Sequence, residues 1–299
     1  MSLLTPLFYT IASILLSIPL LHTLATLLSF PLLAFLARCL ASFFALILCA
    51  SYGVVASIIL RVSGHGGLSQ WTVGRSFKYT MRLLTGVQFT ISDPHSALST
   101  RPAVFVGNHQ SELDVLMLGS MFPRYCSVTA KRSLQYVPVL GWFMLLSKTV
   151  FINRSSSTEA RKAFSEAVKT MKGEGQSVFI FPEGTRSYAR EPRLLPFKKG
   201  AFHLAVQAGV PIVPVVVANY SGVLDVGKRR FESGDIPISV LEPVSTQGLG
   251  PDDVGELVKK VEKSMADELV RVSKRAQETG VAVPGEKAVG VKMAVKQGS

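Results

Sequence analysis

The first sixty residues contain no acidic side chain and only one formal charge, that of Arg38. All twenty Asp and Glu residues lie beyond them, and charged residues make up only 17% of the chain. Soluble domains carry about 25%. This deficit excludes an ordinary soluble N-terminal domain. The 299 residues suffice for one sizeable domain and an appendage.

Several patterns that would carry other chemistries are also missing. The three cysteines form no C-x-x-C pair and no His/Cys cluster at zinc spacing, which excludes a disulfide framework. No G-x-S-x-G elbow is present, so an esterase-type serine has no evident place. Residues 222–229 fit G-x-x-x-x-G-K, but Arg229 stands where a magnesium-binding hydroxyl is needed. We therefore expect no metal and no cofactor.

The N-terminal region is apolar in two runs, residues 3–36 and 39–60, with a hinge expected at Ala37–Arg38. A membrane span needs about 20 apolar residues. The great length and the lack of a basic leader argue against a signal peptide. We predict that residues 1–62 form a pair of membrane-anchoring helices, which either span the bilayer or dip into one leaflet.

Basic residues follow this region, in a stretch that we interpret as a juxtamembrane basic link over residues 63–85 that includes a short helix. By the positive-inside tendency they place the remaining chain on the cytosolic side, and they could also hold anionic lipid. The residues are Arg61, Arg75, Lys78 and Arg82.

Residues 86–250 alternate between strand and helix patterns. Helical periodicity occurs at 157–172, before a stop at Gly173, and at 199–208. Runs rich in β-branched residues lie at 87–91, 103–107, 127–130, 149–152, 177–181, 211–218 and 237–244. The alternation predicts an α/β domain with a mostly parallel mixed sheet flanked by helices. An amphipathic helix is expected over 251–278 and a flexible tail over 279–299.

His109 and Asp114 follow an apolar run, where a strand should end and a helix begin. Open α/β sheets place ligands at such strand ends. A carboxylate bonded to one imidazole nitrogen leaves the other free as a base. The plainer interpretation is a capping box of Ser111 and Asp114, with the histidine only a neighbour. The two interpretations can coexist.

A second candidate is the stretch FIFPEGTRS, residues 179–187. Gly184 permits a tight turn, Thr185 supplies a hydroxyl, and Arg186 can hold a phosphate with two N–H groups. A solvated turn would explain P-E-G-T alone. It would not explain the cations that follow, which are Arg190, Arg193, Lys198 and Lys199.

An apolar insert, residues 136–146, lies between cationic strand ends. Lys131 and Arg132 precede it, and Arg154 follows it. A core helix explains the apolar residues but not the flanking charges, whereas an amphiphile with a phosphate head would suit both. The net charge of +12 likewise favours anionic partners. Nucleic acid is not among them, because it would not explain the apolar N-terminal runs.

Four blocks in order resemble the glycerolipid acyltransferases, over roughly residues 103–216. Asn108-His109-x₄-Asp114 resembles their N-H-x₄-D signature, and residues 181–187 resemble their F-P-E-G-T-R-S block. GWFMLLSKTVFINR, which ends at Arg154, resembles the second block, and VPIVPV the fourth. The 1-acyl-sn-glycerol-3-phosphate (lysophosphatidate) acyltransferase branch matches best.

The resemblance implies a membrane-bound enzyme of phospholipid biosynthesis, with residues 86–250 as its acyltransferase domain. His109 would be the general base, oriented by Asp114, and acyl-CoA would be a co-substrate rather than a cofactor. Phosphatidate would form without an acyl-enzyme. The expected location is the endoplasmic reticulum membrane, although a bacterial inner membrane fits equally. The residues expected to seat the substrate phosphate are Glu183, Gly184, Thr185 and Arg186, with Arg154 and Lys131 assisting.

Three alternatives stay open. The acceptor could be another lysophospholipid or glycerol 3-phosphate. The chain could be a non-catalytic membrane protein that binds anionic lipid, although such binding needs no His109–Asp114 pair. It could also be a hydrolase using Ser111, although two residues on one loop are a poor nucleophile–base pair.

Overall fold

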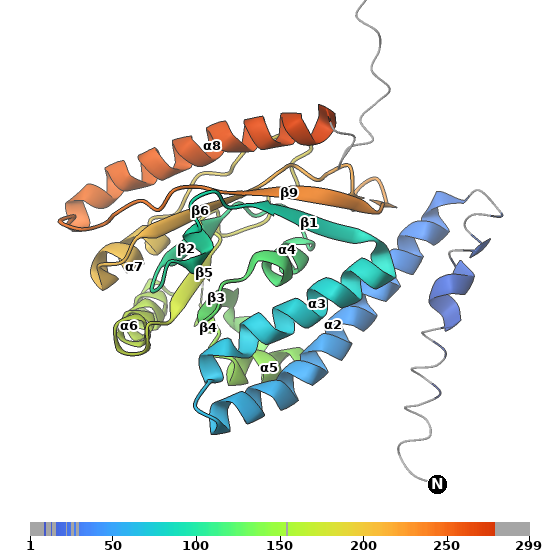
Figure 1. The fold of residues 1–299 in the computed structure, drawn as a ribbon, viewed down its shortest axis with the longest axis horizontal. Coiled ribbons are helices and arrows are strands. Elements are labelled where there is room, and N and C mark those ends of the chain that lie inside the picture. The colour runs from blue at the N-terminus through green and yellow to red at the C-terminus, as the bar shows by residue number, and fades with distance from the viewer. Residues whose placement is uncertain are drawn as a thin grey trace, which may run out of the picture.

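A computed structural model describes residues 16–21, 30–153 and 155–278, together with a few other positions before residue 30. Its main sheet has seven strands in the order β1-β9-β6-β2-β5-β3-β4 (Figure 1). They are β1 (Val87–Ser92), β2 (Val104–Gly107), β3 (Cys126–Lys131), β4 (Val150–Ile152), β5 (Ser177–Ile180), β6 (Ile212–Val217) and β9 (Gly234–Val240). A separate hairpin pairs β7 (Leu224–Asp225) with β8 (Arg230–Phe231). The longer helices are α2 (Pro31–Val62), α3 (Ser69–Thr85), α4 (Asp114–Met121), α5 (Leu140–Leu146), α6 (Ser157–Glu174), α7 (Gly200–Ala208) and α8 (Val254–Glu278).

The sheet is mixed and mostly parallel, which confirms the predicted fold class. Strands β6, β2, β5, β3 and β4 run in one direction. Strand β9 is antiparallel to β6, and β1 is parallel to β9. Every residue of β2, β5 and β6 is buried, because helices cover both faces of the sheet. This explains why these strands are continuously apolar in sequence.

Successive residues along β2 point into two different cores. Phe105 joins the core under α2, α3 and α4, whereas Val104 and Val106 join the core under α6, α7 and α8. Figure 1 shows the two groups of helices on opposite faces of the sheet. All seven predicted strands are present, with boundaries shifted by a few residues.

Helix α2 runs without interruption through Ala37 and Arg38, so the predicted hinge there is wrong. The Arg38 guanidinium does not need a break in the helix, because it donates to the carbonyl of Phe231 at 2.8 Å and pairs with Glu232 at 3.5 Å. Among the described residues, α2 is the one helix long and apolar enough to cross a membrane, with a mean hydropathy of 2.4. The second helix of the predicted pair and the tail 279–299 lie largely or wholly outside the described residues.

Two other segments can be compared with their predictions. Residues 69–85, within the stretch expected to form a basic link and a short helix, form a helix whose Val73, Phe77 and Met81 pack into the core beneath α2. Helix α6 passes the predicted stop at Gly173 and ends at Glu174, and the next residue, Gly175, has the left-handed φ of 61° that is typical of a C-terminal cap.

Candidate active site

The predicted site segments meet at one edge of the sheet. Strands β2, β5 and β6 are parallel neighbours, so the loops after them open on the same side. The loop after β2 carries His109, the loop after β5 carries Glu183 and Arg186, and the loop after β6 carries Tyr220. Residues that are up to 111 positions apart in sequence therefore surround one point.

His109 and Asp114 form a direct pair. Nδ1 of the imidazole lies 2.6 Å from Oδ2 of Asp114. The histidine side chain is 15% exposed and that of the aspartate 1%. Because an ionised carboxylate can only accept, Nδ1 carries the proton, and Nε2 is left with the lone pair of a base.

Asp114 is held by three further donors. Its Oδ2 accepts from the backbone N–H groups of Gln110 at 2.7 Å and Ser111 at 3.1 Å. Its Oδ1 accepts from the Tyr220 hydroxyl at 2.7 Å. The capping box is therefore half formed: Asp114 takes the Ser111 N–H, but the Ser111 hydroxyl bonds to Tyr220. The same carboxylate organises the loop and orients the imidazole.

The imidazole plane rests on Phe181. The two ring centroids are 4.1 Å apart with an interplanar angle of 17°. Phe181 in turn meets the ring of Phe179 edge-on, with centroids 5.1 Å apart. Stacking on one face and bonding at Nδ1 leave the His109 ring one orientation.

Glu183 ties the histidine loop to the loop after β5. Its Oε1 accepts the His109 backbone N–H at 2.7 Å, and its Oε2 accepts the Leu195 N–H at 2.9 Å. The residue is 3% exposed. Burial raises its pKa from 4.5 to about 7, against the two hydrogen bonds, which lower it. Both oxygens are engaged by backbone, and the predicted role in seating a substrate stays a prediction.

Two cations, Arg186 and Lys198, lie at the remaining part of the P-E-G-T-R turn. Gly184 has a φ of 71°, and a Cβ there would lie 2.8 Å from Nζ of Lys198, so the ammonium lies against the turn. Thr185 is exposed. Arg186 is partly exposed and pairs with Glu112 at 3.2 Å, and Glu112 also accepts from the Tyr188 hydroxyl at 2.7 Å. These groups could receive an anion beside His109.

The two remaining predicted residues lie farther along the sheet. Lys131 is exposed at the end of β3, the strand next to β5. Arg154 lies outside the described residues, so its predicted contact with substrate stays a prediction. Within the described part of the chain, no group of three or more His, Cys, Asp or Glu side chains could hold a metal ion.

Comparison with known proteins identifies the family. An acyltransferase family model matches residues 88–218. The 1-acyl-sn-glycerol-3-phosphate acyltransferase of Saccharomyces cerevisiae is 44% identical over 224 residues, which are 75% of this chain and 74% of the yeast protein. The chain belongs to the 1-acyl-sn-glycerol-3-phosphate acyltransferase branch of the glycerolipid acyltransferases.

Other relatives agree with this assignment. The human 1-acyl-sn-glycerol-3-phosphate acyltransferase beta is 40% identical over 240 residues, 78% of this chain and 84% of the human protein. The crystal structure of the 1-acyl-sn-glycerophosphate acyltransferase of Thermotoga maritima superposes with a TM-score of 0.63, at 23% identity, over 80% of this chain and 95% of that one. The similarity to the Thermotoga maritima structure supports the fold.

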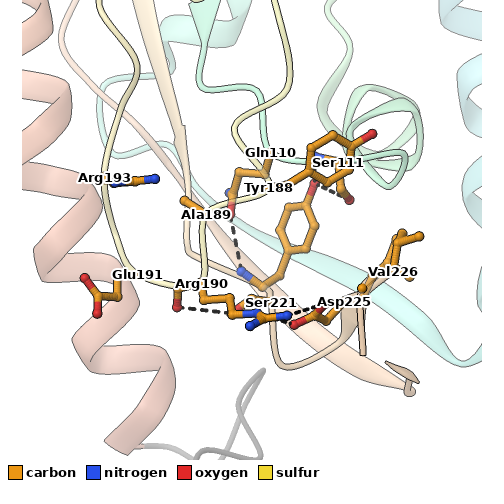
Figure 2. A pocket seen from close by; sticks show the side chains of 13 residues that line it. Gln110, Ser111, Tyr188, Ala189, Arg190, Glu191, Arg193, Ser221, Asp225 and Val226 are labelled. Atoms are coloured by element: carbon orange, nitrogen blue, oxygen red, sulfur yellow. Dashed lines mark hydrogen bonds and ion pairs between the residues drawn. The ribbon is translucent and has the colours of Figure 1, made fainter. Parts of the chain in front are cut away.

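A cavity of about 680 Å³ in the acyltransferase opens beside the histidine loop. Gln110 and Ser111 form one wall of it, and the segment 188–191 forms another (Figure 2). Figure 2 also shows Arg190 reaching across to Asp225, with Nε and Oδ2 2.7 Å apart. This ion pair ties the β7–β8 hairpin to the loop after β5 and so completes the cavity rim.

Sequence reasoning did not single out four residues of the acyltransferase site: Glu112, Phe181, Lys198 and Tyr220. Lys198 was noticed only as part of a cationic run, and Phe181 only as part of a motif. Tyr220 follows β6 by three residues, and no local sequence pattern indicates that it contacts Asp114. The contact could be predicted only from the knowledge that β6 lies beside β2.

The pKa of Glu183 has a consequence for stability. Because it is raised in the folded acyltransferase, the folded chain keeps a proton between pH 4.5 and 7 that the unfolded chain has released. The stability from this proton is complete below about pH 4.5 and is lost as the pH rises through about 7. The loss amounts to about 3 kcal/mol.

We therefore expect the thermal midpoint of the wild type in detergent to fall more between pH 5 and pH 8 than that of Glu183→Gln. The Gln variant lacks the titrating carboxyl. Its amide N–H faces a backbone N–H donor, and the resulting loss of stability is the same at every pH. Glu191→Gln, at an exposed carboxyl, is the control and should follow the wild type. Parallel pH curves for the wild type and Glu183→Gln would contradict the shifted pKa.

Proposed function

We propose that this enzyme transfers a fatty acyl group from acyl-CoA to the sn-2 hydroxyl of lysophosphatidate and so forms phosphatidate. The observation that carries the proposal is the 2.6 Å pair between His109 and Asp114 at the carboxyl edge of the sheet. The relatives named as 1-acyl-sn-glycerol-3-phosphate acyltransferases support the acceptor.

The reaction needs one base and no covalent intermediate. Nε2 of His109 removes the proton from the acceptor hydroxyl while its oxygen attacks the thioester carbonyl carbon. The new C–O bond forms, the C–S bond breaks, and the imidazolium returns its proton to the departing CoA sulfur. Asp114 stabilises the imidazolium between these two steps. Holding both substrates together supplies much of the remaining acceleration.

The geometry disfavours Ser111 as a nucleophile. The serine is buried, and its hydroxyl donates to the Tyr220 hydroxyl at 3.1 Å. Asp114 occupies Nδ1 of His109, so a serine nucleophile would have to bond to Nε2. A hydrolase built on Ser111 would need that hydroxyl at the free nitrogen of His109.

The phosphate of lysophosphatidate is proposed to lie at the turn formed by residues 183–186. Arg186 is partly exposed there, and the ammonium of Lys198 lies against Gly184. A phosphate can accept two N–H groups from a guanidinium, which gives Arg186 an orienting role that a lysine alone would not have. Lys131 adds positive charge at the end of β3, and Arg154, which follows β4 in sequence, is proposed to assist.

We further propose that α2 attaches the enzyme to a membrane. One third of its most apolar stretch is buried, and the other side chains there are partly or fully exposed. Phe43 and Ile47 are exposed apolar side chains on α2, and α5, which packs against α2, exposes Trp142 and Leu145. The expected address is the endoplasmic reticulum membrane, with the catalytic domain on the cytosolic side.

The test is an acceptor and donor panel with membranes that contain the wild-type protein. Labelled oleoyl-CoA is offered with lysophosphatidate, with other lysophospholipids, with glycerol 3-phosphate, or alone, and an acyl carrier protein thioester replaces the CoA donor in a parallel set. We expect labelled phosphatidate from oleoyl-CoA and lysophosphatidate. Faster transfer to another acceptor would overturn the substrate assignment. Free fatty acid without acceptor would favour the hydrolase, and no transfer at all would favour a lipid-binding protein.

A further inference from the structure

Tyr220 is a fully buried polar side chain at the centre of the site. It is 1% exposed and follows β6, the strand beside β2. Its hydroxyl lies 2.7 Å from Oδ1 of Asp114, the oxygen that His109 does not use. The loops after two neighbouring strands thus meet on one carboxylate.

All the bonding capacity of this hydroxyl is used. It accepts from the backbone N–H of Ser111 at 3.0 Å and from the Ser111 hydroxyl at 3.1 Å, so its own proton points to Asp114. Burial, and then the charge of Asp114, raise the pKa of Tyr220 well above 10. The tyrosine is therefore a permanent donor.

The backbone that carries Tyr220 is also fastened to the histidine loop. The amide of Gln110 donates to the carbonyl groups of Val217 at 3.1 Å and Ala218 at 3.0 Å. Asn108 makes a further pair of bonds to the backbone of Val217. The position of the tyrosine relative to Asp114 is therefore set by contacts that do not involve its hydroxyl.

We propose that Tyr220 is a positioning residue for the acyl transfer, and that its hydroxyl acts on His109 through Asp114. This inference rests on the proposed function. The O–H donor at Oδ1 holds the carboxylate so that Oδ2 faces Nδ1 of the imidazole. It also draws negative charge towards Oδ1 and so limits how strongly Asp114 stabilises the imidazolium.

Removal of the hydroxyl has two consequences. Asp114 loses its orientation, which lowers the rate of the chemical step without changing the groups that hold substrate. Its charge is then shared by fewer donors, so it stabilises the imidazolium form of His109 more strongly. The acid limb of the kcat/KM profile, which reports the free base, therefore moves to higher pH.

Other charged groups face this pair. Glu183 lies at the His109 backbone N–H, and Glu112 and Arg186 lie across the same loop. The pKa of Glu183 is about 7, so this carboxyl contributes its own titration to the pH profile. The variants retain all three groups, and the shift is therefore measured as the difference from the wild type.

The experiment compares Tyr220→Phe with the wild type in membranes at equal protein levels. We expect kcat to fall about tenfold or more, since a hydrogen bond to a charged group is lost, with both KM values changed less than about twofold. The acid limb should move to higher pH. Tyr188→Phe is the matched control, because that hydroxyl also donates to a carboxylate, Glu112, at 2.7 Å but does not reach Asp114. Its acid limb should stay in place.

A double variant tests whether Tyr220 acts through Asp114. Tyr220→Phe should lower kcat much less in the Asp114→Asn background than in the wild type, because the two residues act as one unit. An unmoved acid limb together with additive losses would overturn the proposal. If Tyr220→Phe does not accumulate, Ser111→Ala weakens the same hydroxyl and should shift the limb in the same direction by less.

A readout that is independent of acyl transfer separates this inference from the proposed function. Diethyl pyrocarbonate modifies neutral imidazole, so the pH midpoint of His109 modification, followed by mass spectrometry, reports its protonation. The midpoint should rise in Tyr220→Phe even if lysophosphatidate proves to be the wrong acceptor. An identical midpoint in both proteins would refute the coupling, whatever the substrate.

Discussion

Replacement of His109 by alanine is expected to reduce acyl transfer to lysophosphatidate by about 10²–10⁴-fold, the usual contribution of a positioned general base. Nε2 is the nitrogen left to remove a proton from the acceptor hydroxyl, since Nδ1 is engaged by Asp114 at 2.6 Å. The measurement is the initial rate of phosphatidate formation from oleoyl-CoA at equal protein levels.

The alanine variant should still fold. The backbone N–H of His109 keeps its bond to Glu183, and the backbone carbonyl keeps its bond from the N–H of Ser187 at 2.9 Å. His95→Ala is a suitable control, because His95 is exposed and lies outside the site. Equal rates for His109→Ala and the wild type would mean that the N-H-x₄-D segment only shapes the loop.

Asp114→Asn is expected to lower kcat by about 10²–10⁴-fold with little change in KM, comparable with the loss of the orienting carboxylate from other histidine-based sites. Asparagine carries no charge, so it cannot stabilise the imidazolium. Its amide must also present N–H either to the N–H groups around Oδ2 or to the Tyr220 hydroxyl, whose acceptor sites Ser111 already occupies. The measurement is the steady-state rate for both substrates.

Glu112→Gln is the matched control for that prediction. Glu112 lies two residues before Asp114 on the same segment, but it pairs with Arg186 rather than with His109. Its replacement should act mainly on the KM for the acceptor. If Asp114→Asn and Glu112→Gln give the same small loss of kcat, the role assigned to Asp114 is wrong.

Most of the fold could be predicted from hydrophobic periodicity and from the residues at which strands end. Runs such as 103–107 and 177–181 are continuously apolar because both faces of their strands are buried, and this pattern is typical of parallel sheets. His109 and Glu183 follow such runs directly, so their shared position at one sheet edge could be inferred without coordinates. The specific spacing of N-H-x₄-D indicated a histidine base oriented by an aspartate.

The one wrong prediction, the hinge, and the contacts that were not foreseen depend on residues far apart in sequence. A charged residue inside an apolar stretch resembles a hinge, but Arg38 finds partners on the loop after β8, to which no sequence pattern points. The bonds of Glu183 to two backbone N–H groups were not foreseen, because such contacts depend on loop conformation, and its predicted role at the substrate stays a prediction. Tyr220 required knowledge of which strands are adjacent. Tertiary partners, rather than local propensities, decided each case.

The strand order has a consequence for how the enzyme is made. Strand β2 lies between β5 and β6, which follow it by about seventy and one hundred residues. During synthesis the histidine loop therefore leaves the ribosome long before either of its flanking strands exists. Helix α2 is complete earlier still, and β1 must wait for β9. The apolar helix α2 is thus available before the sheet can close. Of the hydrogen-bonded residues His109, Asp114 and Tyr220, Tyr220 is the last to be translated.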